Sequence, residues 1–178
     1  MEDMKSTTKI VIVVIAVALA VLLYKAGTGV KTVSVTNFSE CAARGNPVME
    51  SYPRRCQYGG QTFTEDIGNI LDKMDLIRLN SVSPNSVVQS PLVVSGEARG
   101  YWYFEASFPV VLLDGNENEI AVGIAQAKGE WMTENFVPFE AMLTFTKPAT
   151  TKGTLILKKD NPSGLPENED ELRIPVTF

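Results

Sequence analysis

The sequence predicts an all-β protein, an immunoglobulin-like β-sandwich of about seven strands. Between residue 76 and the C-terminus, short segments with apolar residues at every second position recur, which is the period of a strand with one buried face. Turn-forming residues separate these segments at regular intervals, and none of the segments has the spacing of a convincing helix. Short, regularly spaced strands of this kind are typical of a sandwich.

The segment 101–113 predicts the central strand of this sandwich. From residue 104 onwards its apolar side chains alternate, so that one face carries Phe104, Ala106, Phe108, Val110 and Leu112. Val111 and Leu113 make the second face apolar too, which predicts a strand covered on both sides at its end. Asp114-Gly115-Asn116 then supplies turn residues, so we expect a hairpin.

Six further strands are expected, at residues 76–82, 90–98, 119–127, 136–145, 153–159 and 171–178. Residues 83–86 read as a turn, and residues 67–75 as a linker or one short helical turn. The apolar side chains that alternate in the later strands, and so share one face of each, are Ile120, Val122 and Ile124, then Phe139, Ala141, Leu143 and Phe145, and finally Leu172, Ile174, Val176 and Phe178.

The composition excludes several classes of function. The 178 residues include no histidine, which removes the Ser-His, Cys-His and histidine–metal arrangements of most hydrolases and zinc proteins. The net charge is −5, and the acidic excess lies beyond the first 31 residues. An acidic domain argues against nucleic acid, whose phosphates require a basic face. We expect no cofactor and no metal.

The N-terminus predicts a membrane anchor. Residues 10–24 are uncharged and apolar, between Lys9 and Lys25, and would span about 22 Å as a helix. Extending the run to Val30 gives about the length of a hydrocarbon core, since the Lys25 ammonium can reach the headgroups. The expected organisation is a cytoplasmic tail at 1–9 and a single-pass anchor at 10–30. A cleaved signal peptide and a buried soluble helix remain alternatives.

Cys41 and Cys56 are the only cysteines, and both follow the apolar run. A pair in a small, loop-rich segment downstream of an export signal predicts a disulfide in an oxidising compartment, although two free thiols in a cytosolic protein remain an alternative. Closing a loop of this length stabilises the fold by about 3 kcal/mol. The lysines on the two sides of the run do not decide its orientation, but the cysteines place the rest of the chain outside the cytoplasm.

Residues 31–66 are expected to form a linker and a small module stapled by this disulfide. Gly45, Pro47 and Pro53 oppose a long helix there. Val48, Met49 and Tyr52 are expected to turn inwards or onto a neighbour. The segment also carries three arginines that are either solvated or a contact for an anionic partner, namely Arg44, Arg54 and Arg55.

Four aromatic residues are candidate contacts for a ligand, because exposed rings stack on sugars or anchor a protein partner. They are Tyr101, Trp102, Tyr103 and Trp131, and packing in the core is the alternative for each. Residues 114–119 resemble the start of a calcium loop, but Ile120 and Ala125 stand where later ligands are needed, so a hairpin turn is the better interpretation. The acidic run 166–171 with Asp160 is interpreted as a solvated loop.

Motifs spread over the strands resemble the Gmad2 domain, the immunoglobulin-like domain of bacterial sporulation and spore germination proteins. They are Ser90–Ala98 (SPLVVSGEA), Phe104-Glu105-Ala106, Asp114-Gly115, Pro138-Phe139, Gly153-Thr154-Leu155 and Ile174-Pro175-Val176. The resemblance covers residues 76–178 and implies a non-catalytic, extracytoplasmic module. The cysteine segment is similar to a short module that precedes such domains in small anchored envelope proteins. The GerMN domain that often accompanies Gmad2 is not seen here, so a role in germination is not carried over.

The sequence therefore favours a non-catalytic binding or structural module at the bacterial cell envelope, in contact with another protein or a cell-wall polymer. The alternative is an enzyme that acts on envelope glycans through acidic residues. Glu105 and Glu140 would be its paired carboxylates only if the fold brought the two strands together.

Overall fold

The computed structural model describes residues 15, 17, 18 and 34–178. The expected tail at 1–9 and most of the expected anchor at 10–30 therefore lie outside the described residues. Within the part of the chain that is described, no helix combines the length and the apolar character needed to cross a membrane. Residues 37–178 cluster as one unit of the chain, and they contain all the elements discussed below.

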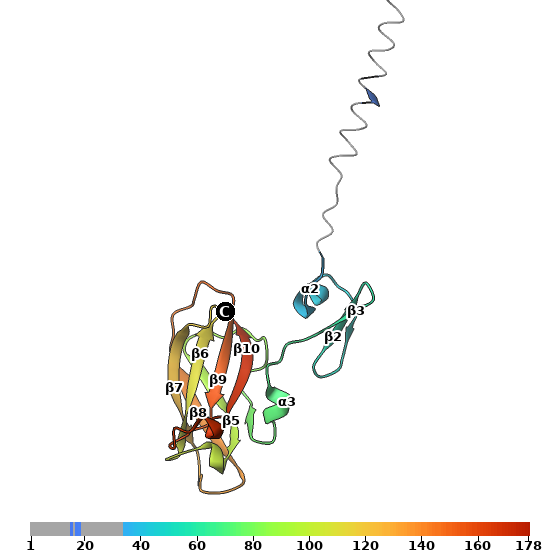
Figure 1. The fold of residues 1–178 in the computed structure, drawn as a ribbon. Helices are drawn as coiled ribbons and strands as arrows, with labels where there is room; N and C mark the ends of the chain where they lie inside the picture. The colour runs from blue at the N-terminus through green and yellow to red at the C-terminus, as the bar shows by residue number, and fades with distance from the viewer. Residues whose placement is uncertain (1–14, 16, 19–33) are drawn as a thin grey trace, which may run out of the picture. The chain divides into compact units, whose positions relative to one another are not determined.

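All seven expected strands are present (Figure 1). They form one hydrogen-bonded ladder in the order β10-β9-β6-β7-β8-β5-β4, in which every neighbouring pair is antiparallel. Their bounds are β4 Ile77–Leu79, β5 Leu92–Arg99, β6 Ser107–Asp114, β7 Glu119–Ala127, β8 Phe136–Leu143, β9 Lys152–Lys158 and β10 Glu171–Thr177, with 3-10 turns η1 at Gly100–Trp102 and η2 at Pro166–Asn168.

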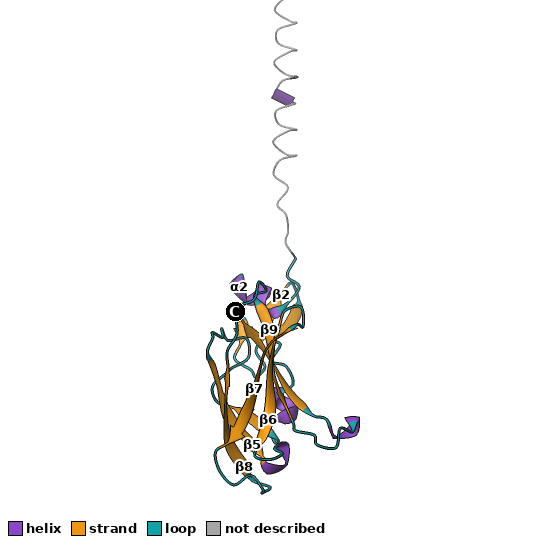
Figure 2. Ribbon diagram, turned by 90° about the vertical axis from the view of Figure 1, so that its left-hand side faces the viewer, coloured by secondary structure: helices purple, strands orange, loops and turns teal. Residues whose placement is uncertain are grey.

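The ladder folds over itself at β7, which makes the sandwich. β7 pairs with β6 along most of its length, but with β8 only at Gln126 and Ala127. The strands β10, β9, β6 and β7 consequently form one layer and β8, β5 and β4 the other, as the two perpendicular views show (Figures 1 and 2). The apolar core lies between the two layers.

The central strand β6 supplies the middle of the core, as the sequence predicts. Phe108, Val110 and Leu112 are fully buried. The Phe108 ring makes edge-to-face contacts with Tyr103 at 5.2 Å and Phe139 at 4.9 Å between ring centroids. Such contacts add to the free energy gained by burying the rings. The expected hairpin between β6 and β7 is also present.

The predicted start of this strand is wrong, because the alternation does not extend back to residue 104. The backbone forms η1 and then a tight reversal in which Glu105 and Ala106 have φ values of 48° and 62°. The N–H and C=O groups of Phe104 and Ser107 pair with each other across this reversal. Phe104 is turned out as a result and is 41% exposed.

The alternating apolar residues expected in β7 do not share one face, because Ile120 packs against the core while Val122 and Ile124 face outwards. Val122 and Ile124 are 53% and 50% exposed, whereas Ala125 is buried. A Cβ on Gly123 would lie 2.9 Å from the Leu143 side chain, so the core has no room for a larger residue at this position. Both faces of this strand are apolar. Because the core beneath it is already filled, only the small side chains of the strand fit on the inner face.

The outer edge of β10 is covered by the chain that precedes β4. The Asn69 backbone N–H donates to the Arg173 carbonyl oxygen, and the Asn69 side-chain oxygen accepts the Arg173 N–H. The Asn69 side-chain amide also donates to the Glu171 carbonyl oxygen. Asn85 donates its backbone N–H to the Pro175 carbonyl oxygen. Of the two alternatives for this segment, a linker or one short helical turn, the helical turn is present as α3, Ile70–Lys73. These hydrogen bonds satisfy the strand edge that would otherwise be open.

The cysteine segment contains α2 Phe38–Ala43 and a small sheet of β1 Val48–Met49, β2 Arg55–Tyr58 and β3 Gln61–Thr64. Of the two orientations expected for Met49 and Tyr52, inwards or onto a neighbour, the inward one is wrong, because these side chains are 39% and 60% exposed. Phe38 and the disulfide occupy the interior instead.

Candidate functional site

Three connections between strands meet at one end of the sandwich, which we call the tip. They are residues 100–106, 128–135 and 159–170. These connections meet because β5, β7 and β9 end, and β6, β8 and β10 begin, at the same end of the sandwich. The tip is opposite to the end at which the chain terminates (Figure 1). Clustered loops at one end of such a sandwich are the usual place for a binding surface on this architecture.

Close backbone packing fixes the first two tip connections. Gly100 lies directly against the 128–135 connection, since a Cβ there would fall 1.9 Å from the Thr133 carbonyl oxygen. Its N–H donates to the Asn135 carbonyl oxygen, and the Arg99 guanidinium donates to that of Glu134. The third connection joins through the Asp160 N–H, which donates to the Trp102 carbonyl oxygen at 3.0 Å. The tip is therefore held in one arrangement.

Of the four aromatic residues predicted from the sequence as ligand contacts, two are buried in the core. Trp102 is fully buried and Tyr103 is 4% exposed, so both belong to the core. The Tyr103 hydroxyl donates to the Val137 carbonyl oxygen at 2.7 Å, and burial raises the pKa of this phenol. The Trp102 indole N–H is the one buried side-chain polar atom without a hydrogen-bond partner in the described part of the chain.

Tyr101 and Trp131 are the two predicted aromatics that a partner can reach. Tyr101 is 51% exposed, and Trp131 is half-buried against the core. Sequence reasoning missed three other apolar side chains exposed in the tip connections: Phe104, Met132 and Leu165. Phe104 was assigned to the core because its left-handed neighbours, Glu105 and Ala106, are not residue types that signal a reversal. Met132 and Leu165 carry no local signal, since single apolar residues in loops are common.

The two acidic residues considered as a catalytic pair have different surroundings. Glu105 lies in the reversal before β6, while Glu140 lies exposed on β8 and pairs with the Lys128 ammonium at 3.2 Å. No group of three or more acidic or cysteine side chains is placed to hold a metal ion within the described residues.

Asp114 closes the β6–β7 hairpin, as the turn interpretation predicts. Its carboxylate accepts from the backbone N–H groups of Asn116 and Asn118 and from the Asn118 side-chain amide. The hydrogen bonds from Asn118 lower the pKa of the Asp114 carboxyl. The oxygens that resemble a calcium loop in the sequence are therefore used to hold the turn.

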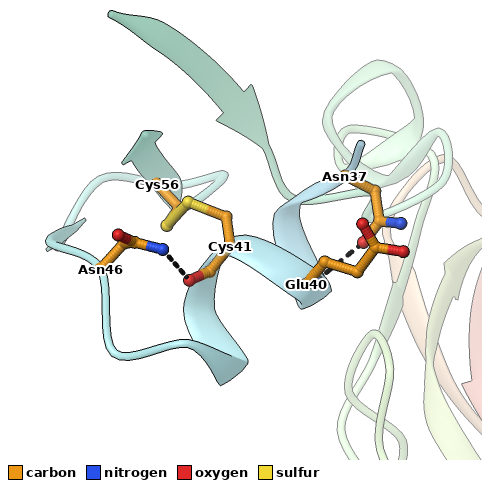
Figure 3. Close-up of a disulfide and its surroundings, with 5 residues drawn as sticks. All are labelled: Asn37, Glu40, Cys41, Asn46 and Cys56. Atoms are coloured by element: carbon orange, nitrogen blue, oxygen red, sulfur yellow. Dashed lines mark hydrogen bonds between the residues drawn. A yellow bond between two sulfur atoms is a disulfide. The ribbon is translucent and has the colours of Figure 1, made fainter. Parts of the chain in front are cut away.

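The cysteine module is held by the predicted disulfide between Cys41 and Cys56, and both residues are fully buried (Figure 3). Asn37 caps α2 by accepting the Glu40 N–H, and the Asn46 amide donates to the Cys41 carbonyl oxygen. The bridge ties the short helix to β2. It takes the place of the apolar core that so small a region lacks.

Arg54, which the sequence left open as a solvated or partner-binding arginine, has a defined place in the structure. Its guanidinium donates two hydrogen bonds to the Glu65 carboxylate, at 2.6 and 2.9 Å, and lies over the Phe38 ring. Glu65 is the one buried charged residue of the described chain. The hydrogen bonds that Arg54 donates to Glu65 lower the pKa of the Glu65 carboxyl and raise the pKa of the Arg54 guanidinium.

Glu65 and Asp66 also meet the sandwich. The Asn85 side-chain amide donates to the Asp66 carbonyl oxygen at 2.8 Å and approaches the Glu65 carboxylate at 3.5 Å. The backbone N–H of Asn85 bonds to β10, as described above. Asn85 therefore links the cysteine module to the end of the sandwich that is far from the tip.

An immunoglobulin-like sandwich with exposed aromatic and aliphatic side chains at its tip is a fold of the binding or structural kind. The comparison with known families agrees. Residues 76–164, half of the chain, match the model of Gmad2, described as the immunoglobulin-like domain of bacterial spore germination. The chain belongs to this family, which is not known as catalytic.

The family match ends before the last strand, which the structure shows to be part of the same sandwich. β10 pairs with β9 along its whole length and contributes Leu172, Ile174 and Val176 to the core. No curated protein and no solved structure matches the chain.

Proposed function

We propose that this protein is a non-catalytic binding or structural module at the bacterial cell envelope. An N-terminal membrane anchor holds it, the domain lies outside the cytoplasm, and the tip contacts another protein or a cell-wall polymer. The exposed apolar and aromatic side chains on the packed tip connections carry this proposal. Rigid aromatic side chains give a large contact area at a small cost in conformational entropy, which is why binding surfaces use them.

Two further observations support the envelope location. The disulfide between Cys41 and Cys56 persists in an oxidising compartment and is rare in the cytosol. The uncharged apolar run at residues 10–24 is the kind of segment that an export pathway recognises and a membrane retains. The acidic net charge disfavours nucleic acid as a partner.

A pulldown of envelope proteins and cell-wall fractions with the full-length chain tests the tip. Tyr101→Ala combined with Met132→Ala should lower retention at least tenfold, because both side chains are exposed on adjacent connections. Val87→Ala is the matched control, since Val87 is 67% exposed beside the last residues of β10, at the far end of the sandwich. Equal retention by both variants would remove the tip from the proposal. A glycan-hydrolysis assay is run alongside, and turnover that Glu105→Gln abolishes would replace the proposal with an enzyme.

The location has its own test. A membrane-impermeant thiol reagent, applied to intact cells after mild reduction, should label Cys41 and Cys56. A requirement for lysis before labelling would place the domain in the cytoplasm, whatever the tip binds.

A further inference from the structure

Four exposed aliphatic side chains lie side by side where the two layers of the sandwich join. Val93 on β5 and Met142 on β8 are cross-strand partners and are 43% and 64% exposed. Gln126 of β7 pairs with Glu140 of β8. Ile124 precedes Gln126 by two residues and Met142 follows Glu140 by two residues, so in these antiparallel strands both lie on the same side of the pair. A Cβ on Gly123 would lie 2.9 Å from the Met142 carbonyl oxygen, which confirms that the strands remain close there. We call Val93, Val122, Ile124 and Met142 the seam patch.

Beyond the seam patch, the outward-facing apolar residues of the next two strands are covered by other parts of the chain. Val122 is in register with Val111 on β6, which is in register with Ile156 on β9. Val111 and Ile156 are only 6% and 3% exposed, although they share the outward-facing register of Val122. Pro109 lies opposite Ile124 in the same way. The exposed apolar surface is therefore confined to the four contiguous side chains of the seam patch, and this contiguity distinguishes it from single exposed apolar residues.

The two edge strands of the ladder, β10 and β4, are protected against association with another chain, whereas the junction of β7 with β8 is not. Hydrogen bonds from residues 69 and 85–88 cover the free edge of β10. The opposite edge strand, β4, has only three residues and carries Arg78, whose guanidinium pairs with Glu97. Short charged edges discourage association. Residues 120–125 of β7 contain no charged side chain.

The chemistry of the seam patch selects its occupant. Its side chains are aliphatic, so it offers neither the rings that stack on sugars nor the cations that bind phosphate. Charges stand only at the two ends of β7, with the exposed Glu119 at its start and Lys128 just beyond its end. Lys128 pairs with Glu140, but both side chains are about half exposed and remain accessible. A second copy with its β7 antiparallel to the first would place Glu119 of each copy near Lys128 of the other.

We propose that two copies of this chain pack face to face through the seam patch, about a two-fold axis that runs between the two β7 strands near Gly123 and is perpendicular to both. Such an interface is self-complementary, since the same apolar centre and the same opposite charges come from each copy. Because the two β7 strands run antiparallel, the two tips lie at opposite ends of the dimer.

Cysteine crosslinking of the full-length chain in membranes tests this interface directly. Both native cysteines are in the disulfide, so an introduced cysteine is the one free thiol. Ile124→Cys should form a covalent dimer under mild oxidation at least tenfold faster than Val87→Cys, which is similarly exposed but lies away from the patch. Equal rates for the two variants would overturn the proposal.

The mass of the detergent-solubilised full-length protein gives a second, independent result. Val122→Asp combined with Ile124→Asp should convert a dimer into a monomer, because four carboxylates would then face one another across the axis. Met132→Asp, at the exposed tip, should leave the dimer intact. A dimer that survives the double substitution, or a wild-type protein that is monomeric at micromolar concentration, would contradict the seam patch as the interface. Both substituted side chains are half exposed, and unchanged thermal unfolding would verify that the fold is retained.

Discussion

The cysteine module and the sandwich hold their folds by different means. In the sandwich, both layers contribute buried apolar side chains to one continuous core. In residues 37–66 the buried apolar side chains are few, Phe38 and the two cysteines among them, and a disulfide and the pair of Arg54 with Glu65 add the missing constraint. A region of this size cannot remove enough apolar surface from water, so its stability has to come from a crosslink and from polar contacts.

The difference predicts that damage will spread differently in the two regions. A cavity in the sandwich affects every strand that lines the core, because the packing is cooperative. Loss of the crosslink should affect the module and leave the sandwich folded.

Phe108→Ala should be the most destabilising single change. The side chain is fully buried at the centre of β6 and contacts the rings of Tyr103 and Phe139, so truncation leaves a cavity in the middle of the core. We expect a loss of about 3–5 kcal/mol in the free energy of unfolding, measured by equilibrium urea denaturation. A loss below about 1 kcal/mol would mean that the core does not depend on this ring.

Replacing both Cys41 and Cys56 with serine should cost about 3 kcal/mol within the module, because the bridge closes a loop of sequence separation 15. Hydrogen exchange should accelerate over residues 38–64 and stay slow over β6 and β9. The control is reduction of the wild-type chain, which should give the same pattern. Fast exchange throughout both regions would show that the sandwich depends on the module and would break the comparison.

The pair of Arg54 with Glu65 should give the module a contribution that depends on pH. The folded-state pKa of Glu65 is lowered, so this contribution is present above the unfolded value of about 4.3 and is lost as the pH falls through the folded value. At pH 7, Glu65→Gln should be less stable than wild type by about 1 kcal/mol, since the Arg54 side chain is half exposed to solvent.

The difference between wild type and Glu65→Gln should shrink in urea melts as the pH is lowered below about 4. Glu97→Gln is the matched control, because Glu97 pairs with Arg78 on the exposed face of the sandwich. The role assigned to Glu65 would fail if its difference from wild type stayed constant down to pH 3.

The sequence was sufficient for the fold wherever one face of a strand is apolar and the other is not. Leu172, Ile174 and Val176 alternate with Arg173 and Pro175, and β10 is found where it is expected. It was insufficient in β7, where both faces are apolar. Which face turns inwards is decided there by the space that Leu143 leaves beside Gly123, and periodicity carries no information about that space.

The candidate site was less predictable than the fold. Tyr101 and Trp131 were identified as accessible aromatics, but Trp102 and Tyr103 are in the core because η1 changes the direction of the chain. The contact of Arg54 with Glu65 joins residues 11 positions apart and has no periodic signal. Sequence periodicity predicts the elements, whereas these contacts depend on how the connections pack.

Ser107→Ala should have the smallest effect, although Ser107 is the neighbour of Phe108. The side chain is half-buried at the first position of β6, and its hydroxyl donates to the Phe104 carbonyl oxygen at 3.3 Å within the preceding reversal. That carbonyl oxygen also accepts the Ser107 N–H, so the reversal keeps a hydrogen bond when the hydroxyl is removed. We expect a change within about 0.5 kcal/mol in the urea melt. A larger loss than that of Phe108→Ala would mean that the two residues had exchanged faces, because a shift of one residue along β6 turns every side chain of the strand over.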